Sequence, residues 1–166
     1  MSSRSQFEIL LPQLRAYARS VAACADDAED LVQDAIERAL RASGCPDDPE
    51  VLKPWMFRVI RNLSIDELRK RRVRMEYSRA QGRLLNETSG QDDTARDVLT
   101  RIAFDKLPPA TREVLFLVDV MGFKYSEAAA VMDVPQGTVM SRISRARRAL
   151  LALLEEDNDI VRRKMR

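Results

Sequence analysis

The chain has 166 residues, of which 33% are charged and 5% aromatic, with five glycines and no histidine. This composition favours an all-helical protein over a sheet-rich one, and the length allows one domain or two small ones. Two cysteines without histidine are too few ligands for a structural zinc site, and a chain without histidine lacks the usual general base of an enzyme.

The net charge is only +2, but the charges are unevenly distributed. Residues 24–50 hold nine acidic and two basic side chains, whereas residues 58–74 hold seven basic and two acidic ones. This separation is typical of a protein with two different partners. The N-terminus carries neither a secretory signal nor a membrane span, so we expect a cytoplasmic protein with reduced thiols.

Two amphipathic helices are predicted first, over residues 7–22 and 28–41. We expect Asp26 to be the N-cap of the second helix, with Glu29 completing a capping box. The predicted buried face of the second helix is Ala28, Leu31, Val32, Ala35, Ile36, Ala39 and Leu40. The opposite stripe is Asp30, Gln33, Asp34 and Glu37. Three interpretations of this stripe remain: a solvated face, a protein-docking face, and a metal site. One helix face cannot easily surround a hard cation, so the metal site is the least favoured.

A third helix is predicted to open at Lys53 and Pro54, after the glycine- and proline-containing residues 43–49. Its predicted core positions are Trp55, Met56, Val59, Ile60 and Leu63. Asn62, Ser64 and Asp66 are weak helix formers, so a break or an exposed corner is expected there. The basic run at residues 69–74 is either a solvated helix end or a surface that follows a nucleic-acid backbone.

Residues 75–93 lose the helical periodicity and contain no proline, which predicts a flexible linker. We therefore expect two helical domains, residues 1–74 and 94–166. In the second domain a helix is predicted over residues 94–106, an interruption at Leu107, Pro108 and Pro109, and a helix over residues 110–121 that Gly122 caps.

A short helix over residues 126–132, with Ser126 as its N-cap, and a turn at Asp133 and Val134 lead to a longer basic helix that starts with Pro135. Its predicted buried face is Val139, Ile143, Ala146 and Leu150. Residues 138–150 contain four arginines and no acidic residue. This pattern is typical of a helix-turn-helix whose second helix enters the major groove of DNA. The alternative is a terminal helix whose arginines only keep it soluble.

Four segments together resemble the extracytoplasmic-function sigma factors of bacterial RNA polymerase, over about residues 7–154. They are DAEDLVQDA at residues 27–35, PWMFRVIRN at residues 54–62, LPPATRE at residues 107–113 and GTVMSR at residues 137–142. The resemblance implies a factor that gives promoter specificity to the polymerase and is not itself an enzyme. No cofactor or metal is implied.

The resemblance also implies roles for individual residues. Docking to the clamp coiled coil of the largest subunit of core RNA polymerase is assigned to Asp30, Leu31, Gln33, Asp34 and Glu37. Recognition and melting of the minus-ten element is assigned to Arg58, Arg61, Asn62, Ser64, Asp66, Arg69 and Arg72, with Asn62 in a corner loop that accepts a flipped base. Recognition of the minus-thirty-five element is assigned to Gln136, Thr138, Met140, Ser141, Arg142, Ser144, Arg145 and Arg148.

Met140 departs from the family, in which many members have Lys or Arg at this position, and an apolar side chain there can pack on a thymine methyl group. The expected partners are core polymerase, promoter DNA and an anti-sigma factor that holds the free protein inactive. Three alternatives are a sigma-like decoy that titrates an anti-sigma factor, a dimeric helix-turn-helix repressor, and an enzyme, which is the least favoured because the sequence has no glycine-rich phosphate loop, no metal-ligand set and no histidine. The decoy is disfavoured by the basic recognition helix, and the repressor leaves the acidic helix unexplained.

Overall fold

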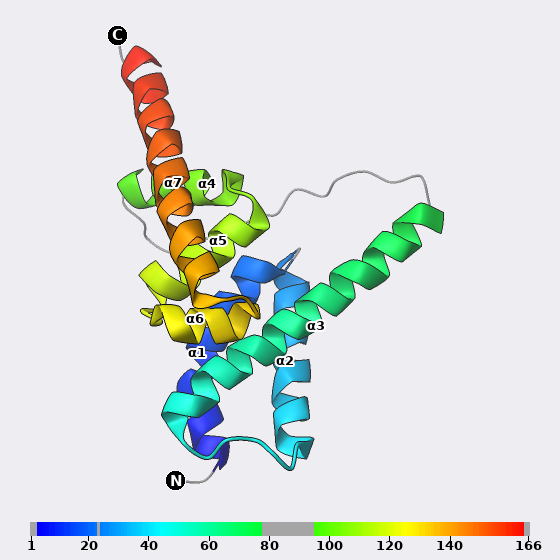
Figure 1. Cartoon of the computed structure of the whole chain (residues 1–166). Helices are drawn as coiled ribbons and strands as arrows, with labels where there is room; N and C mark the ends of the chain where they lie inside the picture. Colours follow the sequence, from blue (N-terminus) through cyan, green and yellow to red (C-terminus); the bar gives the residue numbers. More distant parts are fainter. Residues whose placement is uncertain (1–2, 23, 78–94, 165–166) are drawn as a thin grey trace. The chain divides into compact units, whose positions relative to one another are not determined.

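The computed structural model describes residues 3–22, 24–77 and 95–164, and every regular element in these ranges is a helix (Figure 1). The predicted all-α class is therefore confirmed. The chain divides into two compact units, the first with α1 to α3 and the second with α4, α5, η1 and α7. The predicted linker, residues 75–93, lies outside the described residues from residue 78 onward. The domain limits at residues 74 and 94 remain predictions.

The first unit packs α1 (Ser3–Val21), α2 (Ala25–Arg41) and α3 (Pro49–Tyr77) around one apolar core. Tyr17 and Phe57 are fully buried, and their rings stack with centroids 4.6 Å apart. The large side chains buried around them are Leu14, Val32, Leu52, Met56 and Ile60. Burial of this apolar surface is what holds α2 and α3 in fixed positions on α1.

The N-terminus of α2 differs from the prediction. Cys24, in an extended conformation, is the N-cap, whereas Asp26 lies exposed in the first turn. The Cys24 thiol donates a hydrogen bond to the Asp27 carboxylate at 2.9 Å. The buried face of α2 is otherwise as predicted, except that Leu40 is 62% exposed and Ile36 is half-buried.

The start of α3 was also predicted wrongly, because the helix begins at Pro49 and Pro54 lies inside it. Asp48 caps the helix: its Oδ1 accepts a hydrogen bond from the Glu50 N–H at 2.9 Å. Asp followed by Pro at the first helical position is a stronger start signal than Lys53 and Pro54, because the cap satisfies a backbone donor. Pro54 removes only one N–H, in the second turn.

The expected break at residues 62–66 is wrong, because α3 continues as one helix to Tyr77 (Figure 1). Leu63 and Ser64 are both buried there. The Ser64 hydroxyl donates a hydrogen bond to the Val21 carbonyl at 3.1 Å, which holds α3 against the end of α1. Tertiary packing thus overrides the weak helix propensity of this stretch. Asn62, Ser64 and Asp66 therefore lie on a helix and not in a corner loop.

The predicted core face of α3 was partly wrong. Trp55 and Val59 are only half-buried, and the core is filled instead by Leu52 and Phe57. The helix begins four residues earlier than Lys53, so Leu52 belongs to its first turns. Met56, Ile60 and Leu63 are buried as predicted.

The later helices are α4 (Ala95–Lys106), α5 (Pro109–Leu115), the π-helical turn η1 (Phe116–Val120), α6 (Tyr125–Met132) and α7 (Gln136–Lys164). The interruption between α4 and α5 is confirmed, and the helix predicted over residues 110–121 is divided into α5 and η1. Gly122 has φ +70°, and the following Phe123 N–H donates to the Leu117 carbonyl at 2.9 Å, which confirms the predicted glycine cap.

The helix-turn-helix geometry is present in α6 and α7. Lys124, and not Ser126, precedes the first helical residue, and its N–H donates to the Glu127 carboxylate at 2.7 Å. The turn between the helices is made by Asp133, which has φ 53°. Helix α7 begins at Gln136, one residue after the predicted start, and the Pro135 carbonyl accepts hydrogen bonds from its first turn.

Candidate nucleic-acid interface and acidic helix face

The acidic stripe of α2 faces solvent. Asp30, Gln33, Asp34 and Glu37 are all exposed, and Glu37 forms an ion pair with Arg41 one turn later at 3.2 Å. Leu31, which was predicted to act with them, is 7% exposed and belongs to the core. We name the four exposed residues the acidic face. Three of the four are carboxylates, and a row of exposed carboxylates on one helix face is suited to binding a basic protein surface.

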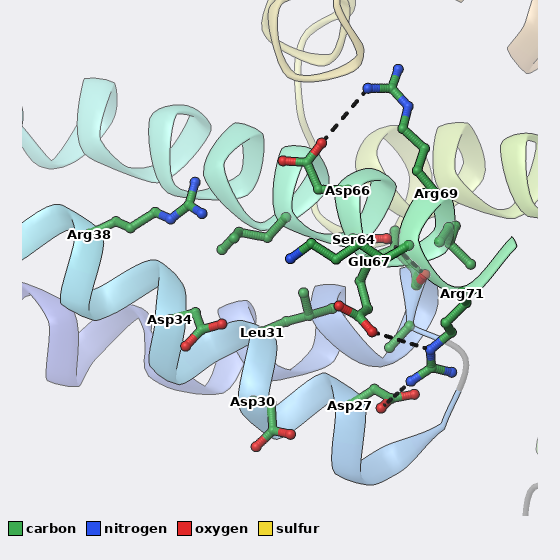
Figure 2. A pocket seen from close by; sticks show the side chains of 15 residues that line it. Asp27, Asp30, Leu31, Asp34, Arg38, Ser64, Asp66, Glu67, Arg69 and Arg71 are labelled. Carbon is green, nitrogen blue, oxygen red and sulfur yellow. Dashed lines mark hydrogen bonds and ion pairs between the residues drawn. The ribbon is translucent and has the colours of Figure 1, made fainter. Parts of the chain in front are cut away.

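An open hollow of about 480 Å³ lies between α2, α3 and the end of α1. Figure 2 shows that residues predicted for two different sites line it together: Asp30 and Asp34 from α2, and Asp66 and Arg69 from α3. Arg69 and Asp66 form an ion pair at 3.8 Å. The structure therefore brings the acidic face next to the start of the basic run. The described residues contain no cluster of three or more potential metal ligands.

A charged network that the sequence did not predict closes one side of the hollow (Figure 2). Arg71 Nη2 lies 2.5 Å from Asp27 Oδ1, and Arg71 Nε lies 3.5 Å from Glu67 Oε1. Burial opposes ionisation of Asp27, but hydrogen bonds from Cys24 and Arg71 and the charge of Arg71 outweigh it, so the pKa of Asp27 is lowered. The hydrogen bond to Asp27 raises the pKa of Arg71. Arg71, one arginine of the basic run, thus forms ion pairs within the protein itself.

The other residues predicted to read the minus-ten element lie along α3. Arg58, Asn62, Asp66, Arg69 and Arg72 are exposed, and Arg61 is half-buried. Ser64 is 5% exposed and its hydroxyl is bonded to Val21, so in this structure it faces the core. Side chains of the helix surface can contact phosphates and bases, whereas a buried hydroxyl cannot do so without a change of structure.

Helix α7 presents one polar face. Val139, Ile143 and Ala146 are buried, whereas Ser141, Ser144, Arg145 and Arg148 recur at three- and four-residue steps on the opposite face and are exposed. Arg145 Nε and Arg148 Nε donate to the carbonyls of Ser141 and Ser144, four residues earlier in each case. We name these four exposed residues the reading face. They have the chemistry of a helix that contacts phosphates and base edges in a groove.

The remaining residues predicted for the minus-thirty-five element flank the reading face. Gln136 and Met140 are exposed, with Met140 at 51%, and Thr138 and Arg142 are half-buried. Met140 is thus placed at the surface as an apolar side chain among polar ones. None of the helices in the part of the chain that the structure describes has the length and apolar character needed to cross a membrane.

Two sequence-family models match the chain in the order of these units. Residues 7–74 match sigma-70 region 2, and residues 102–150 match sigma-70 region 4. The first match covers most of α1, all of α2, and α3 through the basic run, and the second includes the π-helical turn and the helix-turn-helix.

Curated and solved relatives agree with these matches. The chain is 39% identical to the ECF RNA polymerase sigma factor EcfG of Rhodopseudomonas palustris, over 94% of this chain and 87% of EcfG. It is similar to the sigma factor RpoE in complex with the anti-sigma factor NepR from Bartonella quintana, with 32% identity, a TM-score of 0.77, and coverage of 92% and 96% of the two chains. It is also similar to CnrH, a sigma factor of Cupriavidus metallidurans, in complex with the cytosolic domain of CnrY, with 30% identity, a TM-score of 0.62, and coverage of 94% and 91%.

Proposed function

Because this chain belongs to the extracytoplasmic-function sigma factors of bacterial RNA polymerase, we propose that it binds core polymerase through the acidic face of α2 and directs it to promoters through α3 and α7. The polymerase makes the phosphodiester bonds, and this chain supplies the promoter specificity. The observation that carries the proposal is the exposure of all four polar residues of the acidic face.

Docking through the acidic face follows from charge and burial. The four side chains stand on one side of a helix whose other side is fixed in the core by Val32 and Ala35. A helix fixed in this way presents its charges in a defined pattern without a further cost of ordering the backbone on binding. The proposed complement is the basic clamp coiled coil of the largest polymerase subunit. Leu31 supports the face from within the core and is not itself a contact.

Recognition of the two promoter elements is proposed for separate helices. On α3, the proposed contacts to the minus-ten element are Arg58, Arg61, Asn62, Asp66, Arg69 and Arg72. Ser64 is removed from this set because it is buried. On α7, the reading face together with Gln136, Thr138, Met140 and Arg142 is proposed to contact the minus-thirty-five element as duplex DNA.

An anti-sigma factor is the proposed regulator. RpoE and CnrH, two relatives of known structure, each have an anti-sigma factor or the cytosolic domain of a partner bound in their solved complexes. Because the chain is 32% identical to RpoE over nearly its whole length, we propose an anti-sigma factor similar to NepR as the protein that holds it inactive.

The test is a core-polymerase pull-down followed by run-off transcription from a genomic promoter library. Wild-type protein is expected to bind core and to select a small set of promoters, and Asp34→Arg is expected to lose both. The matched control is Glu8→Arg, which reverses an exposed charge on α1 of the same unit and is expected to retain both activities.

The experiment also separates the proposal from the decoy alternative. A decoy binds an anti-sigma factor such as NepR but binds no core polymerase and starts no transcription. Binding of wild-type protein to NepR without any binding to core would therefore replace the sigma-factor proposal with the decoy.

A further inference from the structure

One arginine of α7 is paired with a residue outside the helix-turn-helix. Arg147 Nε donates to Asp119 Oδ2 at 3.1 Å, and Arg147 Nη2 donates to Asp119 Oδ1 at 2.6 Å. Both nitrogens on one edge of the guanidinium are thus matched to the two oxygens of one carboxylate. Bidentate geometry fixes the orientation as well as the distance of the two groups, which distinguishes it from an ordinary surface ion pair.

Arg147 does not belong to the reading face. It lies seven residues, or about two helical turns, after Met140, on a flank between the buried face and the reading face. Arg145 and Arg148, its neighbours in sequence, belong to the reading face and donate to backbone carbonyls of α7 itself. The arginines at the start of α7 therefore differ in what their guanidinium groups bind, although the sequence presents them as one basic cluster.

Asp119 owes its position to the π-helical turn. In η1 the Met121 N–H donates to the carbonyl of Phe116, five residues earlier, at 2.8 Å. This wider turn inserts an extra residue compared with an α-helix, and such turns often occur at functional sites. Leu117 of the same turn is fully buried, so the turn is anchored in the core while the Asp119 carboxylate stays at the surface.

Tyr125, the first residue of α6, interacts with the same guanidinium. The hydrogen bonds that Arg147 donates to Asp119 are the main cause of the raised pKa of Arg147, against a smaller opposing effect of burial, and a hydrogen bond with Tyr125 adds to the rise. Arg147 is thus bound by η1 and by the first helix of the helix-turn-helix while it is itself part of the second.

We infer that Asp119 and Arg147 are positioning residues that set the angle at which α7 presents its reading face to DNA, and that Arg147 is not a phosphate contact. The inference rests on the proposed function, because it concerns recognition of the minus-thirty-five element by α7. The guanidinium charge is already matched by a carboxylate, so release of counterions from DNA by this side chain is not expected. Its contribution is orientation, on which the discrimination between base sequences depends.

The test uses the full chain bound to core polymerase and a labelled promoter fragment, with affinity measured at several salt concentrations. The variants are Arg147→Ala, Asp119→Ala and the double variant, and the comparison variant is Arg145→Ala. A second fragment with a scrambled minus-thirty-five element gives the sequence discrimination. Thermal unfolding by circular dichroism verifies that each variant is folded, and Asp119→Asn replaces Asp119→Ala if the latter unfolds.

Arg145→Ala is expected to reduce the slope of log affinity against log salt by about one, as loss of a phosphate contact does. Arg147→Ala and Asp119→Ala are each expected to leave this slope unchanged and to reduce the discrimination between the two fragments by about threefold or more. The double variant is expected to lose no more discrimination than either single variant, because the two residues act as a coupled pair.

A salt-dependence slope reduced by about one in Arg147→Ala would identify Arg147 as a phosphate contact. This result would overturn the inference but leave the proposed function standing. Unchanged discrimination in the folded Asp119 variant would overturn it as well. If the wild-type complex with core shows no promoter binding, the proposed function fails, and the inference that rests on it fails too. If the wild type binds the promoter and only the variants behave otherwise than expected, the inference alone fails.

Discussion

Arg71 Nη2 lies 2.5 Å from Asp27 Oδ1, so the basic run at the end of α3 is tied to the first turn of α2. The carboxylate of Asp27 also accepts a hydrogen bond from the Cys24 thiol at the N-cap of α2. An acidic side chain in the first turn is favoured by the helix dipole, and here it also holds two helices together. The helix that carries the acidic face is therefore joined to the basic run of α3 by an ion pair within the first unit.

Asp27→Asn is expected to lower the free energy of unfolding of the first unit by about 1 kcal/mol at pH 7, which is the order of a partly exposed charged hydrogen bond. Because the pKa of Asp27 is lowered in the folded state, its contribution is fully present above the unfolded pKa of about 4 and is lost as the pH falls through the folded value. The difference between variant and wild type should therefore disappear as the pH falls below the folded-state pKa of Asp27, where its carboxyl group is neutral in both the folded and the unfolded wild-type protein.

The measurement is urea unfolding at pH 7 and at low pH, followed by the fluorescence of Trp55, which is the only tryptophan and lies in α3. Asp26→Asn, in the same turn but exposed, is the control and should change little at either pH. A difference for Asp27→Asn that persists unchanged at low pH would show that the effect does not come from the ion pair.

Ser64→Ala is expected to destabilise the first unit by about 1 kcal/mol, because the Val21 carbonyl at the end of α1 loses a partly buried hydrogen bond. Promoter melting by the folded variant should remain. Asn62→Ala, two residues earlier and on the exposed side of α3, is expected to do the reverse, with reduced melting and unchanged stability. Urea unfolding and permanganate footprinting of the complex with core polymerase distinguish the two. Reduced melting by Ser64→Ala at full stability would restore Ser64 to the DNA-contacting set.

Met140 is expected to pack on a thymine methyl group of the minus-thirty-five element. Replacement of that thymine by deoxyuridine removes only the methyl group, and it should weaken wild-type binding by about fourfold, the equivalent of one buried methyl at about 0.8 kcal/mol. Met140→Lys should become insensitive to this replacement. Affinities are measured for the complex with core on a series of fragments in which each thymine is replaced in turn. Equal sensitivity of wild type and Met140→Lys at every position would exclude the contact.

Gly122→Ala is expected to destabilise the second unit by about 1 kcal/mol, because a residue with a Cβ is strained at φ +70°. No atom lies within 4 Å of the position that the added Cβ would take, so the cost comes from the backbone and not from a clash. Gly137→Ala is the matched control: its Cβ also meets nothing within 4 Å, and it lies in α7. Calorimetric unfolding should show a lower transition temperature for Gly122→Ala and not for Gly137→Ala.

Much of the first unit followed from local pattern. The apolar spacing of residues 28–39 predicted which side of α2 is buried, and the four polar residues opposite it are exposed as expected. Helix ends were less predictable. Cys24, Asp48 and Lys124 occupy the positions before α2, α3 and α6, where Asp26, Lys53 with Pro54, and Ser126 had been expected. Several residues in each stretch have capping chemistry, and local sequence does not choose among them.

By itself the sequence determined the helical class and the division into two helical units. It also determined the glycine cap at Gly122 and the buried sides of α2 and α7, apart from Leu40, which is exposed, and Ile36 and Leu150, which are half-buried, because these features depend mainly on residues within a few turns of the chain. Only the tertiary structure decided that α3 runs unbroken through Ser64, that Arg71 pairs with Asp27, and that Arg147 pairs with Asp119. These pairs join residues 28 or more positions apart. Burial and charge pairing at such separations depend on how the helices pack. Arginines that are close together in the sequence therefore have different roles in the folded protein.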